Sequence, residues 1–417
     1  MKVAIYGDSL LDLGTGETIP NPVVVVEDQR IVAVGDRATT SVSRDAESVD
    51  ASGLTLLPGL IDCHVHLRSK GTGRDAADWL ATPPSLWLLG TVPHAAKTLD
   101  AGFTTIREAG GSPAGLKMAI ERGYFPGPRM LVTLTEISQT GGNTDQHYGC
   151  GADLAIRLPD IPPAVVDGVE PMRLRVRELI RAGADWIKLC TTGGILTPND
   201  DPKNPTLTFE EISAAVQEAA AQGRKVMCHA QSSQGVKNAL RAGAATIEHG
   251  FWLDDDSIEM LLNGHNALVP TLIAPIWIVR HAEAGRIPPW GAAKGREVVD
   301  DHKASIRRAI EAGVTIAFGT DTGVGPHGSM GEEFLVMHEL GLSTLDCLRS
   351  ATTIAAETIG LGGRVGTLSQ GAFGDVIGVP GDPLADLNVV AKPENVQLVI
   401  KGGEVMKDLR IGQCVAG

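Results

Sequence analysis

Two histidines one residue apart end an apolar run near the start of the chain, Leu60-Ile61-Asp62-Cys63-His64-Val65-His66. Side chains alternate between the two faces of a strand, so His64 and His66 would share one face and Val65 would take the other. Two imidazoles in this arrangement can chelate one cation such as Zn²⁺. An isolated His-x-His pair also arises by chance, so a metal site requires further ligands elsewhere in the chain.

Four other residues lie at the ends of later apolar runs, and each could bind a metal or move a proton. They are Lys188, His229, His249 and Asp321. In a barrel of parallel strands the active-site residues lie at the carboxyl ends of the strands, so all six would meet at one rim. Taken singly, Lys188 could be an ion-pair partner and Asp321 a helix cap. Four histidines, a lysine and an aspartate at one rim indicate a metal site and not a Ser/His/Asp triad.

Lys188 needs its own explanation, because a protonated ammonium has no lone pair for a cation. A desolvated, neutral lysine can react with CO₂ to give a carbamate. The two carbamate oxygens could bridge two metal ions about 3.5–4 Å apart, the spacing of two-metal sites. The pattern therefore favours a binuclear centre.

The elements that must position these residues follow a weak repeat, in which a helix ends in Ala-Gly and a short apolar strand follows. The pattern predicts eight strands, at 57–62, 103–106, 130–135, 186–190, 225–229, 245–248, 267–271 and 314–319. Eight parallel strands with intervening helices predict an α/β fold with a (β/α)8 TIM barrel. A doubly wound open sheet is the alternative, although no Gly-x-Gly-x-x-Gly follows the early strands.

The two ends of the chain have a different, β-rich pattern. Short β-branched runs at 23–26 and 31–34 predict a hairpin, and the runs at 375–379 and 396–400 have the same character. We therefore expect residues 1–57 plus 361–417 to form a small β-sandwich domain built from both chain termini. Residues 58–360 would form the hydrolase barrel.

Composition excludes several classes of protein. The net charge is −14, from 36 Lys and Arg against 50 Asp and Glu, so an acidic surface would repel nucleic acid. No stretch approaches the ~20 apolar residues that span a bilayer, and the first residues lack the apolar core of a signal peptide. The six cysteines show no Cys-x-x-Cys spacing and are expected to be reduced thiols. We expect a cytoplasmic homo-oligomer that acts on a small molecule, without nucleic-acid or membrane partners.

The segments 58–66, 247–250 and 319–323, together with Lys188 and His229, resemble the amidohydrolase superfamily over nearly the whole chain. The resemblance implies that His64, His66 and Asp321 bind one metal, that His229 and His249 bind the second, and that a carboxylated Lys188 bridges them. It also implies that Asp321 takes the proton from the bridging hydroxide. Zn²⁺ suits this nitrogen and oxygen ligand set, and Mn²⁺, Co²⁺ or Fe²⁺ could also bind.

Within that superfamily the chain resembles the imidazolonepropionase-like branch, which includes Xaa-Pro dipeptidases and ochratoxin-type amide hydrolases. The resemblance is carried by Ser-Gln-Thr-Gly-Gly at 138–142, Thr-Thr-Gly-Gly at 191–194 and Ile-Glu-His-Gly at 247–250. The chain departs from the dipeptidase pattern at Asn143, where a histidine is expected, and at Gln231, where a tyrosine is expected. The candidate substrate-binding residues are Gln139, Asn143, His147, Tyr148, Gln231 and His327.

The sequence therefore predicts a binuclear metal-dependent amidohydrolase that cleaves an amide or carbamate C–N bond by a metal-bridging hydroxide. A peptide-like compound or an N-acyl amino acid is the expected amide. The alternatives are a cyclic amidohydrolase or deaminase, a lactonase or phosphotriesterase-like activity on the same site, and a non-catalytic protein with the same fold. In the last case ligands are usually lost, and none is lost here.

Overall fold

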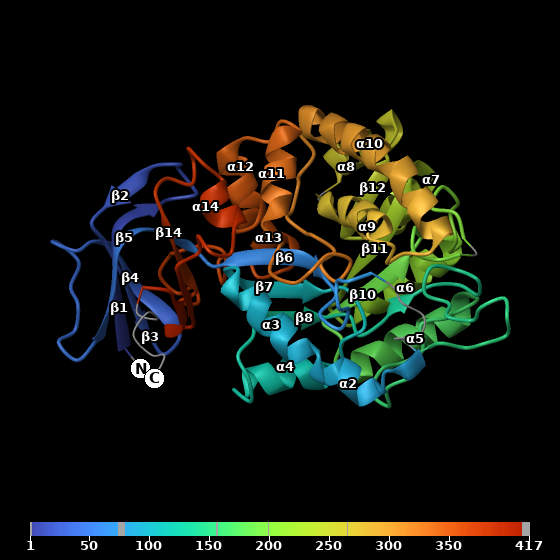
Figure 1. The fold of residues 1–417 in the computed structure, drawn as a ribbon, viewed down its shortest axis with the longest axis horizontal. Helices are drawn as coiled ribbons and strands as arrows, with labels where there is room; N and C mark the ends of the chain where they lie inside the picture. Colours follow the sequence, from blue (N-terminus) through green and yellow to red (C-terminus); the bar gives the residue numbers. More distant parts are fainter. Residues whose placement is uncertain (1, 74–79, 156, 199, 265, 411–417) are drawn as a thin grey trace.

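The computed structural model describes residues 2–73, 80–155, 157–198, 200–264 and 266–410. Its α/β architecture combines one mixed sheet with two parallel sheets and their helices (Figure 1). No helix among these residues is both long enough and apolar enough to cross a membrane.

The mixed sheet is built from both ends of the sequence and lies at one end of the molecule (Figure 1). Its strand order is β16-β15-β14-β5-β1-β3-β4, with β2 beside β1. Strands β1 and β5 are parallel and the other neighbouring strands are antiparallel. The predicted hairpin is confirmed by the pairing of β3 with β4. A two-layer sandwich and the predicted domain limits stay predictions. The strands are β1 (Lys2–Leu11), β2 (Thr18–Pro20), β3 (Pro22–Glu27), β4 (Arg30–Asp36), β5 (Glu47–Pro58), β14 (Val376–Pro380), β15 (Leu398–Lys401) and β16 (Glu404–Asp408).

The parallel strands occupy the middle of the chain and are almost entirely buried, as continuous apolar runs in parallel sheets usually are. One sheet has the order β6-β7-β8 and the other the order β13-β12-β11-β10-β9. The strands are β6 (Leu60–Val65), β7 (Phe103–Glu108), β8 (Arg129–Val132), β9 (Glu136–Ile137), β10 (Trp186–Cys190), β11 (Lys225–Ser232), β12 (Thr246–Trp252) and β13 (Ala267–Val269).

Two of the predicted strands are irregular. The predicted strand at 130–135 ends early as β8, because Leu134 has a φ of 69°, outside the extended region, and β9 begins beyond it at Glu136. The segment at 314–319 is not a regular strand. It is nevertheless linked to both parallel sheets, since Ile316 bridges Leu268 in parallel and the Phe318 carbonyl accepts from the Cys63 N–H at 2.9 Å.

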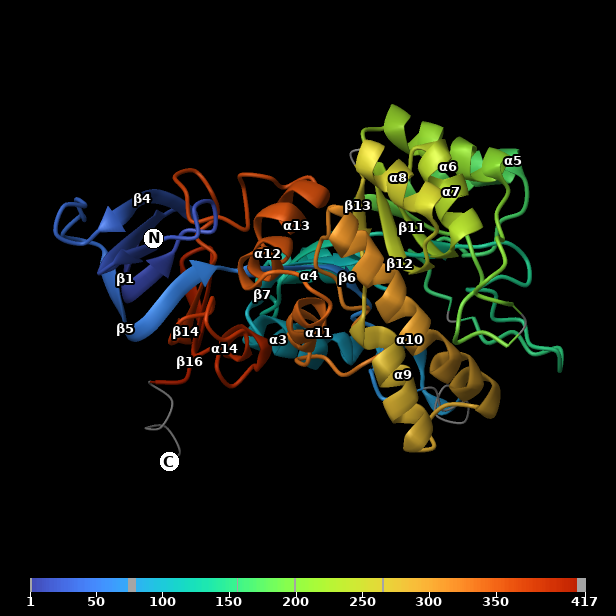
Figure 2. The ribbon, with the colours of Figure 1, turned by 90° about the horizontal axis from the view of Figure 1, so that it is seen from above.

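The helices begin and end at residues that explain their limits. Thr208 forms a capping box with Glu211 at the start of α6, and Asp254 caps α8. Helix α7 ends at Gly243, whose φ of 93° stops the helix before β12, as the Ala-Gly pattern predicts. Figure 2 shows α6, α7 and α8 beside β11 and β12. The helices are α2 (Pro84–Leu89), α3 (Thr91–Asp100), α4 (Ala114–Glu121), α5 (Val169–Arg181), α6 (Phe209–Ala221), α7 (Ser233–Ala242), α8 (Asp255–Asn263), α9 (Ile273–Glu283), α10 (Pro289–Ala312), α11 (Glu332–Glu339), α12 (Thr344–Ser350), α13 (Thr353–Thr358) and α14 (Asn388–Ala391).

Candidate metal centre

The carboxyl ends of the parallel strands open into one cavity of about 1360 Å³. The six residues predicted as metal ligands all line it, and they come from β6, β10, β11, β12 and the loop after 314–319: His64, His66, Lys188, His229, His249 and Asp321. The fold therefore brings together residues up to 257 positions apart in the sequence, from His64 to Asp321. Their role as ligands stays a prediction.

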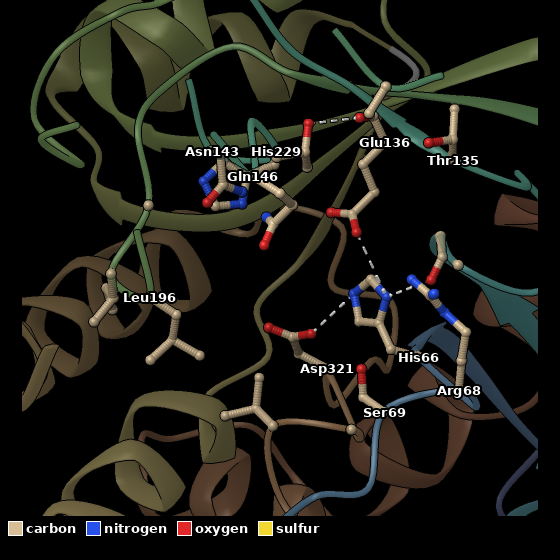
Figure 3. A pocket seen from close by; sticks show the side chains of 18 of the residues that line it. His66, Arg68, Ser69, Thr135, Glu136, Asn143, Gln146, Leu196, His229 and Asp321 are labelled. Atoms are coloured by element: carbon tan, nitrogen blue, oxygen red, sulfur yellow. Dashed lines mark hydrogen bonds and ion pairs between the residues drawn. The ribbon is translucent and has the colours of Figure 1, made fainter. Parts of the chain in front are cut away.

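His64, His66 and Asp321 are the tightest group. One possible ligand atom from each lies within 4.8 Å of the others. Asp321 Oδ1 is 3.2 Å from His66 Nε2 and 3.7 Å from His64 Nε2. In Figure 3 the His66 ring lies between the carboxylates of Asp321 and Glu136. Two imidazole nitrogens and a carboxylate oxygen converging at this range fit a cation such as Zn²⁺.

Each of the four histidines has one ring nitrogen hydrogen-bonded to a group outside the candidate ligands. The acceptors fix which nitrogen carries the proton, as second-shell partners of metal-binding histidines do. The pairs are His64 Nδ1 with Glu248 Oε2 at 2.8 Å, His66 Nδ1 with the Gly110 carbonyl at 2.9 Å, His229 Nε2 with the Gly193 carbonyl at 3.0 Å, and His249 Nδ1 with Thr271 Oγ1 at 2.7 Å. The second ring nitrogens of His64 and His66 face another candidate ligand, Asp321, at 3.7 and 3.2 Å. These pairings leave the second nitrogens to the group of candidate ligands.

The ionisation of three of the four histidines suits metal binding. Burial lowers the pKa of His64 and of His249 well below the ordinary value, and lowers the pKa of His229 to about 4. These imidazoles are consequently neutral near pH 7 and keep a lone pair. Burial also acts to lower the pKa of His66, but the neighbouring carboxylates, chiefly those of Glu136 and Asp321, outweigh it and raise the pKa to about 9.

Asp321 has an ionised carboxylate. Burial acts to raise its pKa, but the hydrogen bond from His66 and the positive charges around it bring the pKa below the ordinary value. An ionised carboxylate can both bind a cation and accept a proton. Asp321 has a φ of 56° and His249 a φ of 79°, left-handed values that are uncommon outside glycine. Such strain is concentrated at functional sites in proteins generally.

Lys188 lies in the centre of the group. Its side chain is 1 % exposed, and its Nζ is 3.5 Å from His64 Nε2. Among the residues that the structure describes, no carboxylate lies within ion-pair distance of this nitrogen. A buried cation without a partner is costly, so conversion to an anionic carbamate is consistent with its surroundings.

A buried ion pair behind His64 was not anticipated as part of the site. Arg107 donates from Nε to the Cys63 carbonyl at 2.7 Å and from Nη2 to Glu248 Oε1 at 2.9 Å. Both side chains are 0 % exposed, and Thr246 also donates to Glu248. The signal available in the sequence was charge inside buried strands, since Arg107 and Glu248 follow apolar residues of β7 and β12.

The predicted substrate residues divide into two groups. Asn143, His147 and Gln231 line the cavity, whereas Gln139, Tyr148 and His327 are not among its lining residues.

His327 has a different environment from the one predicted. Its ring is 7 % exposed and stacks on His94 at 4.2 Å, and its Nε2 donates to the Ser69 carbonyl at 2.8 Å. His94 Nδ1 donates to the Leu67 carbonyl at 2.7 Å. The two rings therefore hold the segment that follows His66, and a contact of His327 with substrate stays a prediction.

The cavity also has walls that the sequence did not reveal. One side belongs to a small hydrophobic cluster separate from the main core, and its cavity-lining members are Ile195, Leu196, Phe251, Ile278, Ile287 and Val324. Arg286 lies beside this side, and within the described parts of the chain its guanidinium has no ion-pair partner.

Comparison with known proteins identifies the family. The model of the amidohydrolase family matches residues 55–406. The chain is 31% identical to an ochratoxinase of Aspergillus niger over 426 aligned residues, which cover 99% of this chain and 88% of the relative.

Solved structures agree with this assignment. A Xaa-Pro dipeptidase with bound methionine is 30% identical, with a TM-score of 0.88 over 97% of this chain and 99% of that one. A prolidase complexed with N-methylphosphonate-L-proline is 33% identical, with a TM-score of 0.90 over 98% of this chain and 100% of that one. The predicted resemblance is confirmed: the chain belongs to the amidohydrolase family and is a hydrolase that acts on the C–N bonds of amides.

Proposed function

We propose that the protein is a binuclear metal-dependent hydrolase that cleaves the amide bond of an N-acyl amino acid or a similar peptide-like small molecule. One observation carries the proposal: four histidines, each with one ring nitrogen held by a group outside the candidate ligands, line a single cavity together with Lys188 and Asp321. A carbamate is the second substrate class that the same arrangement could accept.

Two divalent cations, most simply Zn²⁺, fit the donor set. His64, His66 and Asp321 would hold the first, His229 and His249 the second, and a carboxylated Lys188 both. When bound, such ions polarise a carbonyl and lower the pKa of water to about 7. The neutral imidazoles and the burial of Lys188 beside His64 support this assignment.

Asp321 is the group that moves the proton. Its carboxylate is ionised and its Oδ1 lies within 3.7 Å of both histidines of the His-x-His pair, so it is next to the reacting centre. It accepts the proton released by the attacking water and returns it to the nitrogen of the leaving amine. Bond cleavage therefore yields a carboxylic acid and an amine.

A closed (β/α)8 barrel over residues 58–360 would explain why the six residues meet. It is supported by the segment 314–319, whose bonds to Leu268 and Cys63 connect the outermost strands β13 and β6 of the two parallel sheets. Carboxyl ends of barrel strands form the active site throughout this fold. The terminal strands would then form the separate sandwich domain, residues 1–57 plus 361–417.

The walls of the cavity support an N-acyl amino acid as substrate. The apolar side formed by residues such as Ile278 and Ile287 suits a large side chain, and the guanidinium of Arg286 suits a carboxylate. The names ochratoxinase and prolidase among the relatives belong to enzymes of amide bonds, which agrees with this class.

The test is a substrate screen with protein loaded with Zn²⁺, covering N-acyl amino acids, dipeptides, carbamates and lactones, together with elemental analysis. We expect about two ions per chain and turnover of N-acyl amino acids above the other classes. A lactone as the best substrate, or fewer than two ions per active chain, would overturn the proposal.

A further inference from the structure

Gln231 is a polar residue of the cavity that lies on β11, close in sequence to the candidate metal ligand His229. It follows His229 by two residues on β11, so both side chains leave the same face, about 6–7 Å apart along the strand. It lines the cavity and is only 3 % exposed. Its carboxamide therefore lies in the same cavity as the candidate metal ligands.

The side-chain oxygen of Gln231 is unpaired among the residues that the structure describes. The backbone N–H of Gln231, by contrast, donates to Thr192 Oγ1 at 3.1 Å. Asn143, which also lines the cavity, is engaged instead, because its Nδ2 donates to Cys190 Sγ at 3.6 Å and its Oδ1 accepts from Thr197 at 3.5 Å. A buried polar group left unpaired is rare in proteins, so the missing partner of Gln231 is expected to come from a ligand.

A secondary amide supplies that partner. Its carbonyl oxygen is directed to the metal centre in the proposed reaction. The N–H of the scissile bond then still needs a hydrogen-bond acceptor. A tertiary amide, such as an N-acylated proline or an N-methyl amino acid, has no such hydrogen.

We propose that Gln231 accepts a hydrogen bond from the scissile N–H and so makes the enzyme selective for N-acyl derivatives of primary amino acids over those of proline. The proposal rests on the amide-hydrolase function proposed above and deepens it. It also separates this chain from its Xaa-Pro dipeptidase and prolidase relatives.

The expected size of the effect follows from the cost of an unpaired buried acceptor. That cost corresponds to roughly 5- to 150-fold in kcat/KM. Sites built around a substrate N–H reject analogues that lack it more strongly than hydrophobic pockets reject an altered side chain. We therefore expect a preference of about tenfold or more for the secondary amide.

The experiment compares N-acetyl-L-phenylalanine with N-acetyl-N-methyl-L-phenylalanine in the wild-type protein and in Gln231→Met. Methionine keeps the length of the side chain and removes both polar atoms. The variant should lose activity on the secondary amide, so that the ratio of kcat/KM values falls by about tenfold. Gln146→Met makes the same change at a more exposed glutamine of the same cavity and should leave the ratio as it is.

A pair of inhibitors measures binding without turnover and without the added methyl group. A phosphonamidate and its phosphinate differ in the group at the position of the scissile nitrogen, which is a donor NH in the first and a CH₂ without a donor in the second. The phosphonamidate should bind the wild type about tenfold more tightly, and Gln231→Met should abolish the difference at equal metal content.

The two proposals fail in different ways. Hydrolysis of both amides at equal rates, or an equal inhibitor preference in Gln231→Met and wild type, would overturn the role of Gln231 and leave the amide hydrolase intact. Failure to hydrolyse either amide while lactones are cleaved would overturn the proposed function, and the inhibitor pair would still decide the role of Gln231.

Discussion

The buried contact between Glu248 and Arg107 behind His64 offers the sharpest test of how the fold prepares the site. Replacing Glu248 with glutamine keeps the shape but leaves one acceptor oxygen where the carboxylate had two. That oxygen cannot serve both His64 Nδ1, now 2.8 Å from Oε2, and Arg107 Nη2, now 2.9 Å from Oε1. If the new NH₂ faces His64, the ring proton must move to Nε2, the nitrogen that faces the cavity. If it faces Arg107, two donors oppose each other.

The magnitude follows from burial. Both side chains are 0 % exposed, so Glu248→Gln leaves the guanidinium of Arg107 as a buried charge without a counter-charge. Removal of one partner from a buried pair costs about 3–5 kcal/mol. Loss of the acceptor that orients a metal-binding histidine reduces metal affinity by about 10–100-fold. Replacing Arg107 with methionine as well removes the orphaned charge, so the double variant should recover about 0.5–3 kcal/mol relative to the sum of the single changes.

The assay is the free energy of unfolding of metal-free protein, with metal affinity measured separately by competition with a chromophoric chelator. Glu259→Gln, the same change at an exposed position of α8, is the matched control and should leave both quantities unaltered. A neutral surface change alters the free energy of unfolding by at most about 0.5 kcal/mol. If Glu248→Gln changes it by no more than that and also binds metal normally, the positioning role of Glu248 is refuted.

Three further results are expected. Lys188→Ala should lower metal content and reduce turnover by orders of magnitude, and a short carboxylic acid such as acetate or propionate should restore part of it; near-normal turnover without added acid would exclude a bridging role. Asp321→Asn keeps an oxygen ligand but cannot take a proton, so kcat should fall by about 10²–10⁴-fold while metal content changes little; a parallel fall of both would make Asp321 a ligand only. Asp254→Ala should destabilise the protein by about 1 kcal/mol at pH 7, because Asp254 accepts from the Ser257 N–H at the start of α8. Burial acts to raise the pKa of Asp254, but the hydrogen bonds from Lys237, Ser233 and Ser257 lower it below the ordinary 3.8. This stabilisation is therefore complete above pH 3.8 and is lost as the pH falls further, so the melting temperatures of wild type and variant should converge in acid.

Much of the candidate site could be predicted because its candidate metal ligands lie at the ends of strands. His64, His229 and His249 each follow a short apolar run, and the repeating αβ pattern is enough to bring such positions to one edge. What could not be predicted depends on contacts between distant elements. Arg107 and Glu248 are 141 residues apart in the chain, and neither residue type indicates that the other is its partner.

Backbone geometry set the limits of the fold prediction. Leu134 carries a left-handed φ that ends the third predicted strand early, although nothing distinguishes this leucine from its extended neighbours in the sequence. The stacking of His327 on His94 could not be predicted for a related reason, since it depends on how a loop packs on α3.

The mixed sheet has a consequence for how the chain is made in the cell. Strand β5 pairs with β1 on one side and with β14 on the other, in register from Pro58 with Val376 to Leu54 with Pro380. At translation rates of about 5–20 residues per second, the edge of β5 waits on the order of 15–60 s for residues 59–375 to leave the ribosome. An unpaired strand edge is a template for pairing with the wrong partner. Pauses in the translation of 59–375 would therefore lower the yield of folded enzyme without altering any contact of the finished protein.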